Sequence, residues 1–261
     1  MYETLTYSIE DSVGIICLNR PESANAMNPL MGKELNQVSL DVSEDDNVRA
    51  VVLTSTGRMF CAGGDLSEFA ASGKGARRLM MNMAADLHLG LSRLSRNRAP
   101  VVAAVNGTAA GAGFSLVMAC DLAIAAEEAV FTMAYTNAGL SPDGSSTYFM
   151  PRKIGDRRTR ELMLTNRVLS ADEALDWGIV NKVVTKDELM DTTMDLAIKL
   201  SQGPSLAHGK VKALLDSSFT QSLETQMELE ARAISEMVLT EDGQEGINAF
   251  LEKRKPAFRG K

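Results

Sequence analysis

One plan occurs twice in this sequence and limits its possible folds more than any other feature. Each copy has an apolar strand, a loop of small residues and the start of a helix. The first copy is VVLTSTGRMFCAGGDLSEF, residues 51–69, and the second is VVAAVNGTAAGAGFSLVM, residues 101–118. Strands that alternate with helices are typical of layered α/β proteins. We therefore expect an α/β fold.

The rest of the chain divides into a mixed part and a helical part. Strands are expected over 5–9 and 13–18 as a hairpin, and short strands over 122–133 and 179–184. Asn28 and Pro29 predict the start of a helix to about 43, and a long helix follows over 76–97. We place the catalytic core in 1–202 and a C-terminal helical region in 203–261. The apolar residues Ile247, Phe250 and Leu251 need a surface, either on this chain's own core or on a neighbouring subunit.

Charge and composition exclude several classes of function. Thirty-four acidic against 27 basic side chains give a net charge of −7, which argues against nucleic acid and anionic membranes as partners. No apolar run reaches the ~20 residues of a membrane span, and no secretory signal is visible at the amino end, so we expect a cytoplasmic protein. Cys17, Cys61 and Cys120 are then reduced thiols. His88 and His208 are too few for a histidine-built site, and we predict no metal.

The two small-residue loops suggest a chemical role. Small residues let a substrate approach the backbone, and the helix that follows directs its free N–H groups towards the bound group. Two such amides on one oxygen form an oxyanion hole, with about 3–4 kcal/mol of transition-state stabilisation per donor. Tight strand-to-helix connections with packing glycines are the alternative. Neither loop has the pattern of a Rossmann or P-loop nucleotide site.

Several motifs in order carry a family resemblance. FCAGGDL, PVVAAVNGTAAGAG, DLAIAAEEAVF and ADEALDWGIVNKVV, with RPESANAMN near the start and EGINAFLEKRKPAF near the end, resemble the crotonase superfamily of enoyl-CoA hydratases and isomerases. The resemblance covers essentially the whole chain. It implies a ββα spiral core with a C-terminal helical trimerisation region, assembled as a homotrimer or a dimer of trimers. It also implies an acyl-CoA substrate and no separate cofactor, since coenzyme A is part of the substrate.

The resemblance assigns roles to particular positions. The two oxyanion donors are the backbone amides of Gly64 and Ala112. Substrate binding falls on Ala24, Ala26, Ala62, Asp65, Leu66, Ser67, Tyr135 and Lys253. Ala24 and Ala26 would approach the adenine, and Lys253 would reach the coenzyme A phosphate of a neighbouring subunit unless it is an ordinary surface lysine. The expected pocket walls are Phe114, Met118, Met133, Tyr135 and Phe149.

The acid–base residues decide the reaction. Hydratases of the family use two glutamates, and this chain has Ser115 and Tyr135 at those positions. A hydroxyl and a phenol cannot act as that pair near neutral pH. Asp143 remains, at a position where isomerases of the family carry a single acid, as in ring-epoxide phenylacetyl-CoA isomerases and Δ3,Δ2-enoyl-CoA isomerases. Asp143 could instead be the N-cap of the helix that follows it.

Three alternatives to isomerisation stay open. In 4-chlorobenzoyl-CoA dehalogenases, which this region also resembles, the equivalent of Asp143 is a nucleophile assisted by a histidine at the position of His88 and by an aromatic residue at that of Tyr135. Against this, Gly64 stands where those enzymes carry an aromatic residue. Hydratase-like chemistry is the second alternative, and a non-catalytic protein of the same fold that binds a ligand or acts as a scaffold is the third. We predict an acyl-CoA isomerase with Asp143 as the proton carrier.

Overall fold

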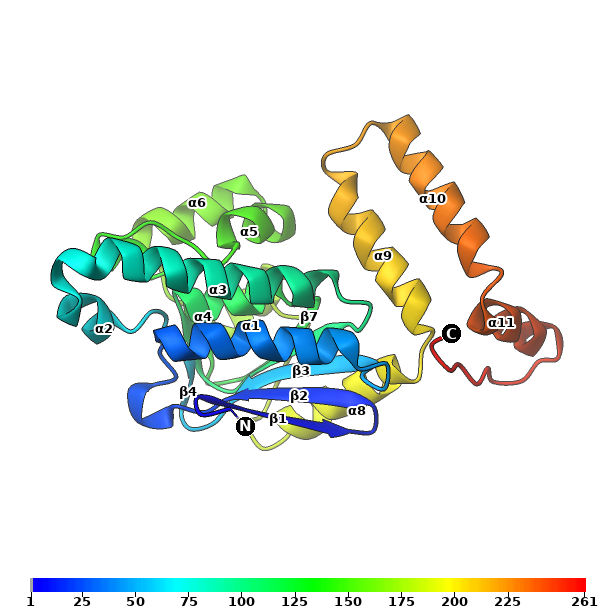
Figure 1. Ribbon diagram of the computed structural model, residues 1–261, viewed down its shortest axis with the longest axis horizontal. Helices are drawn as coiled ribbons and strands as arrows, with labels where there is room; N and C mark the ends of the chain where they lie inside the picture. Colours follow the sequence, from blue (N-terminus) through cyan, green and yellow to red (C-terminus); the bar gives the residue numbers. More distant parts are fainter. Residues whose placement is uncertain (1) are drawn as a thin grey trace.

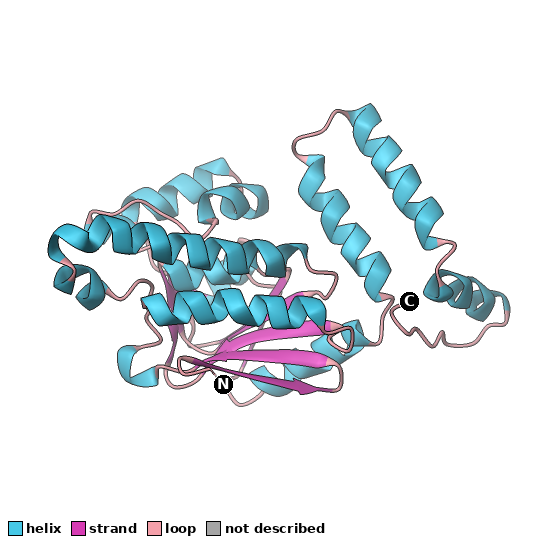
Figure 2. Cartoon of the chain, viewed as in Figure 1, coloured by secondary structure: helices cyan, strands magenta, loops and turns pink. Residues whose placement is uncertain are grey.

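The computed structural model describes residues 2–261, and in it the chain winds between two sheets (Figures 1 and 2). The larger sheet has the order β1 (Leu5–Glu10), β2 (Val13–Leu18), β3 (Ala50–Ser55), β5 (Val101–Val105), β7 (Leu122–Ala126) and β10 (Lys182–Val184). The smaller sheet has the order β4 (Met59–Cys61), β6 (Thr108–Ala110), β8 (Val130–Thr132) and β9 (Leu169–Ser170). β1 is antiparallel to β2, whereas the pairs from β2 to β10 are parallel.

Successive turns of the chain visit the two sheets alternately. β3, β5 and β7 lie in the larger sheet, and each is followed by a strand of the smaller one and then by helix. The first turn continues into α2 (Leu66–Ala71), η2 (Gly73–Gly75) and α3 (Ala76–Arg96). The second continues into α4 (Ala112–Ala119), and the third into η3 (Tyr135–Ala138), α5 (Ser146–Ile154) and α6 (Asp156–Thr165). This is the ββα spiral that the resemblance implies, and the expected α/β fold is confirmed.

The parallel pairing of β4 with β6 brings the two small-residue loops together. Met59 lies opposite Thr108 and Cys61 opposite Ala109, so both loops leave the same end of neighbouring strands. Each apolar strand, small-residue loop and helix start of the sequence is therefore one turn of the spiral, and consecutive turns bring their loops to one edge of the smaller sheet.

Local sequence explains several element boundaries. Asp11 and Ser12 both have positive φ, 49° and 62°, in the two-residue turn that joins β1 and β2. The Asn28 side chain accepts a hydrogen bond of 2.8 Å from the Met31 amide at the start of α1 (Pro29–Glu44), as an N-cap does. The expected strand over 179–184 is shorter, Lys182–Val184, because the Ile179 amide bonds to Ala174 O and closes α7 (Ala171–Asp176). A 3-10 turn, η1 (Pro21–Ser23), precedes α1.

Helices cover both faces of the larger sheet. α1 and α3 lie side by side above it in Figure 1, and α8 (Leu189–Ser201) packs on the other face. Leu53 and Val101 belong to the main apolar core, whereas Val52 and Ile124 point the other way and pack with Leu189 of α8. None of the helices in residues 2–261 combines the length and the apolar character that a bilayer crossing needs.

The last three helices project from this layered body. α9 (Ser205–Ser218), α10 (Leu223–Met237) and α11 (Glu241–Leu251) form an arm at the right of Figure 1, and the expected boundary near residue 203 falls in the turn between α8 and α9. Lys212 of α9 ties the arm to the body, because its buried Nζ lies 2.7 Å from Asp121 Oδ2 and 3.3 Å from Leu94 O. Phe250 is 82% exposed, so α11 does not pack its apolar face on this chain's core.

Candidate active site

A cavity of about 250 Å³ opens where the two small-residue loops meet α3 and the segment before α5. Its backbone side is formed by Ala62, Gly63, Gly64, Gly111 and Ala112. Its apolar side comes mainly from Phe69, Met80, Met83, Leu87 and Leu140, and Tyr135 and Asp143 complete it. The cavity therefore combines an apolar wall with backbone amides and one carboxylate.

The two loops lie as close as their backbones allow. A Cβ on Gly113 would lie 2.3 Å from Cys61 O, so only glycine lets α4 start against the end of β4. Beside Gly64, the Met27 amide bonds to Gly63 O at 2.7 Å and the Asp65 amide bonds to Met27 O at 2.9 Å. These contacts fix the first loop in place beside the start of α4.

Both candidate oxyanion donors have a free N–H. Within residues 2–261, neither the Gly64 amide nor the Ala112 amide donates to a backbone carbonyl, although both residues line the cavity. Ala112 is the first residue of α4, where the N–H has no partner inside the helix and the helix dipole favours negative charge. The arrangement can therefore hold a developing oxyanion.

The Asp143 carboxylate takes part in the cavity and does not cap α5. The N-cap residue of that helix is Ser145, with no side-chain capping bond. The Asp143 side chain is 30% exposed, and its Oδ1 accepts a hydrogen bond of 2.7 Å from the Tyr135 hydroxyl. The capping alternative is thus wrong, because the carboxylate is held on the cavity side by a residue of the preceding loop.

Tyr135 is a hydrogen-bond donor in this site. Burial raises the pKa of its hydroxyl far above the ordinary value, and the nearby charge of Asp143 raises it further. The phenol therefore stays protonated at neutral pH and can donate to Asp143 throughout the physiological range.

Ser115 lies behind Tyr135, away from the cavity. Its side chain is fully buried, and its Oγ lies 3.1 Å from the Tyr135 hydroxyl, 3.1 Å from Asp143 O and 3.2 Å from Gly111 O. A Cβ on Gly144 would lie 2.8 Å from Ser115 Cβ, so glycine at 144 lets the loop that carries Asp143 settle on Ser115.

His88 approaches Asp143 from α3. Its Nε2 lies 4.0 Å from Asp143 Oδ2 and accepts a hydrogen bond of 3.1 Å from the Gly144 amide. A nitrogen that accepts from an amide carries no proton, so His88 does not donate to the carboxylate in this arrangement. The imidazole also lines a separate groove between α3, α5 and α9.

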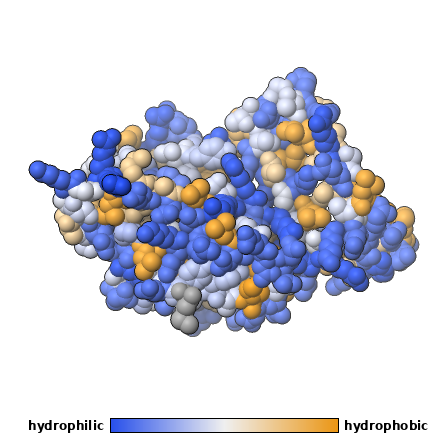
Figure 3. All heavy atoms as spheres, viewed as in Figure 1, coloured by the Kyte–Doolittle hydropathy of each residue, from blue (hydrophilic) through white to orange (hydrophobic). Residues whose placement is uncertain are grey.

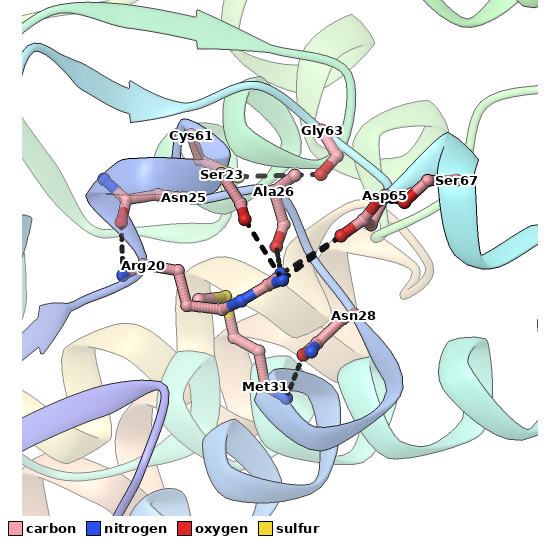
Figure 4. A network of polar contacts seen from close by, with 10 residues as sticks. All are labelled: Arg20, Ser23, Asn25, Ala26, Asn28, Met31, Cys61, Gly63, Asp65 and Ser67. Carbon is pink, nitrogen blue, oxygen red and sulfur yellow. Dashed lines mark hydrogen bonds and ion pairs between the residues drawn. The ribbon is translucent and has the colours of Figure 1, made fainter.

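The predicted substrate-binding residues occupy different parts of the structure. Ala62, Leu66 and Tyr135 line the cavity, whereas Ala24 and Ala26 are not among its lining residues. Arg20 holds the loop that contains Ala26 (Figure 4). Arg20 Nη1 donates to Ala26 O at 2.6 Å, and the Ala62 amide donates to Ala24 O at 3.0 Å.

Asp65 and Ser67 bond to neighbours within the chain. Arg20 contacts Asp65 Oδ2 at 3.3 Å, and the Ser67 hydroxyl donates to Asp65 Oδ1 at 2.6 Å (Figure 4). Burial raises the pKa of Asp65, but the hydrogen bonds from Ser67 and Arg20 outweigh it and hold the pKa below its usual value. Asp65 is therefore a charged partner of Arg20 that stiffens the first loop.

Lys253 is exposed on the arm, two residues beyond Leu251, the last residue of α11. The arm projects away from the loops that form the cavity (Figure 1), so Lys253 does not join the other predicted residues within one chain. A role in substrate binding would require a neighbouring subunit, as the resemblance implies.

The expected pocket walls are mostly wrong. Phe114, Met118 and Met133 are fully buried in the core, and Phe149 lines the groove behind His88. The actual walls come from α2, α3 and the loop before Asp143, including Phe69, Met80 and Leu140. The apolar residues of α3 recur at helical spacing, which predicts a buried helix face. That spacing is the same whether the face lines a cavity or packs on the core, so it could not identify the cavity wall.

Comparison with known proteins agrees with this geometry. The model of the enoyl-CoA hydratase/isomerase family matches residues 8–261. The chain is 38% identical to the 1,2-epoxyphenylacetyl-CoA isomerase of Escherichia coli (strain K12), with 100% of both chains covered. It is 37% identical to a "probable enoyl-CoA hydratase" of Rhodobacter capsulatus, covering 100% of this chain and 99% of the other.

A solved structure extends the likeness to three dimensions. An enoyl-CoA hydratase from Polaromonas sp. JS666 superposes with a TM-score of 0.93 at 32% identity, over 98% of this chain and 99% of the other. The sequence resemblance is thus confirmed over nearly the full length. The chain belongs to the enoyl-CoA hydratase/isomerase family.

Proposed function

We propose that the protein is an acyl-CoA isomerase in which Asp143 carries the proton. The observation that carries this proposal is one cavity lined by two free backbone amides, of Gly64 and Ala112, and by the carboxylate of Asp143. The thioester oxygen would bind between the two amides, and the acyl chain would extend along the apolar wall.

The proposed steps conserve protons. The two amides stabilise the negative charge that develops on the thioester oxygen, which acidifies the carbon positions conjugated to it. Asp143 removes a proton from one carbon and returns it to another, so the double bond shifts and the carboxylate is regenerated. The reaction needs no cofactor, because coenzyme A enters and leaves as part of the substrate.

The residues at the two hydratase positions favour isomerisation over hydration. Ser115 is buried behind Tyr135, and Tyr135 is a protonated donor, so neither can act as the general base that activates a water. One carboxylate suffices for a proton shuttle, whereas hydration in this family's pattern uses two.

The substrate class follows from the cavity and one relative. An apolar cavity of about 250 Å³ suits a compact hydrophobic acyl group. The relative from Escherichia coli is named for 1,2-epoxyphenylacetyl-CoA, so ring-epoxide and 3-enoyl thioesters are the first substrates to test.

Replacement of Asp143 by asparagine tests the proposal. On a panel of ring-epoxide, 3-enoyl, 2-enoyl and halobenzoyl-CoA thioesters, we expect turnover of an isomerisable member to fall by about 10²–10⁴-fold in Asp143→Asn. Binding of the same thioester, read as a rise in melting temperature, should remain. Wild-type turnover in the variant would exclude Asp143 as the proton carrier, and no thermal response to any thioester would favour a non-catalytic protein.

A hydrolytic reaction is a second candidate, favoured by the 4.0 Å approach of His88 to Asp143. In that case an Asp143 oxygen would attack the halogen-bearing ring carbon of a halobenzoyl-CoA and displace halide. Water would then attack the carboxyl carbon of the resulting ester, so the product leaves with the Asp143 oxygen and Asp143 takes the oxygen of water. A single turnover in H₂¹⁸O followed by mass spectrometry of the 143 peptide separates the two. Isomerisation leaves Asp143 unlabelled, whereas hydrolysis through an ester to Asp143 labels it.

We also propose assembly as a homotrimer or a dimer of trimers. Exposed apolar side chains gather on the C-terminal helices, seen as orange patches over the arm in Figure 3. They include Leu215, Phe219, Ile234, Leu239, Phe250 and Leu251. Such a surface is large for a lone chain and is typical of a protein interface, and assembly would bring Lys253 to a neighbouring subunit's substrate.

A further inference from the structure

We propose that Tyr135, supported by Ser115, reserves Oδ1 of Asp143 and leaves Oδ2 as the oxygen that carries the proton. Tyr135 and Ser115 are then positioning residues for the reaction proposed above, on which this inference rests. Ser115 and Tyr135, which stand where hydratases carry their two glutamates, would thus orient the carboxylate of Asp143.

The count of hydroxyl hydrogens supports this assignment. An ionised carboxylate only accepts, so the 2.7 Å contact between the Tyr135 hydroxyl and Asp143 Oδ1 uses the single hydrogen of Tyr135. The 3.1 Å contact between Ser115 Oγ and the Tyr135 oxygen can then be bridged only by the hydrogen of Ser115. Tyr135 therefore donates to Asp143, and Ser115 can support Tyr135 with its one hydrogen, for which Asp143 O at 3.1 Å and Gly111 O at 3.2 Å are the other acceptors.

The second carboxylate oxygen has no such partner. Within residues 2–261, no side-chain or backbone donor bonds to Oδ2 of Asp143. His88 Nε2 lies 4.0 Å from Oδ2, and it already accepts from the Gly144 amide. Oδ2 is thus free to form the bond that the reaction requires.

One atom, Oδ2 of Asp143, then both takes the proton and returns it. The C–H bond of the substrate breaks and an O–H bond forms at Oδ2, while the electron pair moves into the conjugated system. In the second half, the O–H bond at Oδ2 breaks and a C–H bond forms at another carbon. Oδ1 keeps its hydrogen bond from Tyr135 in both halves, so the carboxyl group does not rotate.

The pH profile of kcat/KM tests the inference, because its acid limb reports protonation of the catalytic base. A hydrogen bond to a carboxylate favours its charged form, so Tyr135→Phe should move the acid limb upward by about one pH unit. Ser115→Ala should move it in the same direction by less. The double variant should match Tyr135→Phe alone, because Ser115 acts through the hydroxyl that is already gone.

Tyr148→Phe is the matched control. Tyr148 is exposed on α5, and its hydroxyl contacts Asp216 O at 3.4 Å, outside the cavity. Its profile should be that of the wild type. If Tyr135→Phe melts too early to assay, Ser115→Ala carries the test by its own upward shift.

An unchanged acid limb in Tyr135→Phe or in Ser115→Ala overturns the inference, as do additive shifts in the double variant. A different result would contradict the proposed function, namely full activity in the Asp143→Asn variant. Loss of activity in Asp143→Asn together with an unchanged limb in Tyr135→Phe would keep the isomerase and remove only the positioning role.

Discussion

At the scale of single residues, burial controls the chemistry of the cysteines. Cys61 and Cys120 are buried, and desolvation raises the pKa of these thiols to about 11 and about 12. Because the thiolate is the reactive form, we expect iodoacetamide at pH 8 to alkylate both at least about a hundredfold more slowly in the native protein than in urea. Peptide mass spectrometry of each cysteine measures this. Equal rates in the two states would show that the thiols are accessible in the native fold.

The same pKa shifts should lower the free energy of unfolding as the pH becomes alkaline. In the unfolded chain these thiols ionise near pH 8.5–9, whereas in the folded chain they hold their protons up to about 11 and about 12. Their contribution is therefore fully present below pH 8.5 and is lost as the pH rises through the folded values. Urea unfolding midpoints should fall steadily above pH 9, and the double variant Cys61→Ala, Cys120→Ala should show a flatter decline. Parallel declines in both proteins would contradict this explanation.

The role of Asp143 could not be decided from its residue type and position in the sequence. The residue type and its place before a helix fit both a cap and a catalytic acid, and sequence alone cannot separate them. The separation depends on Tyr135, whose hydroxyl reaches Asp143 only when the loop between them folds back. Contacts that depend on such a loop have no signal in local residue spacing.

At the scale of elements, the start of α4 depends on contact with β4. Gly113→Ala would place a Cβ 2.3 Å from Cys61 O, a backbone atom that cannot move alone. We expect a loss of about 1–3 kcal/mol in the free energy of unfolding, and lower turnover because the Ala112 amide shifts with the helix. Thermal or urea unfolding together with the isomerase assay measures both.

Gly75→Ala is the matched control for that variant. Gly75 has helical backbone angles, and no atom lies within 4 Å of an added Cβ. The change should be neutral or stabilising by about 0.5 kcal/mol. If Gly113→Ala proved as harmless as Gly75→Ala, close packing of the two loops would not position α4.

The elements themselves were largely predictable, because their signals are local. The hairpin turn, the Asn28 cap and the two strand–loop–helix segments follow from residue type and spacing. The cavity wall was not predictable in this way. Met80 and Leu87 share one stripe of α3 with core residues, and only the path of the loop before Asp143 makes them line a cavity.

At the scale of the whole molecule, the arm presents several exposed apolar side chains. If it mediates the proposed assembly, Phe250→Glu, at a side chain 82% exposed on α11, should convert the oligomer to smaller species. Sedimentation velocity measures this, and Ile9→Glu is the control, since Ile9 is 45% exposed on β1 of the core. A wild-type protein that sediments as a monomer would rule out the proposed trimer.

Gly64 and Ala112 offer only main-chain atoms to the cavity, whereas positions 115, 135 and 143 offer side chains. Many point mutations can exchange any of those three side chains, whereas at positions 64 and 112 only a change to proline removes the main-chain N–H. If the two amides activate the thioester as proposed, that activation depends on the path of the main chain, whereas the reaction depends on three side chains that single substitutions can change. Redesign of this scaffold should begin with those three.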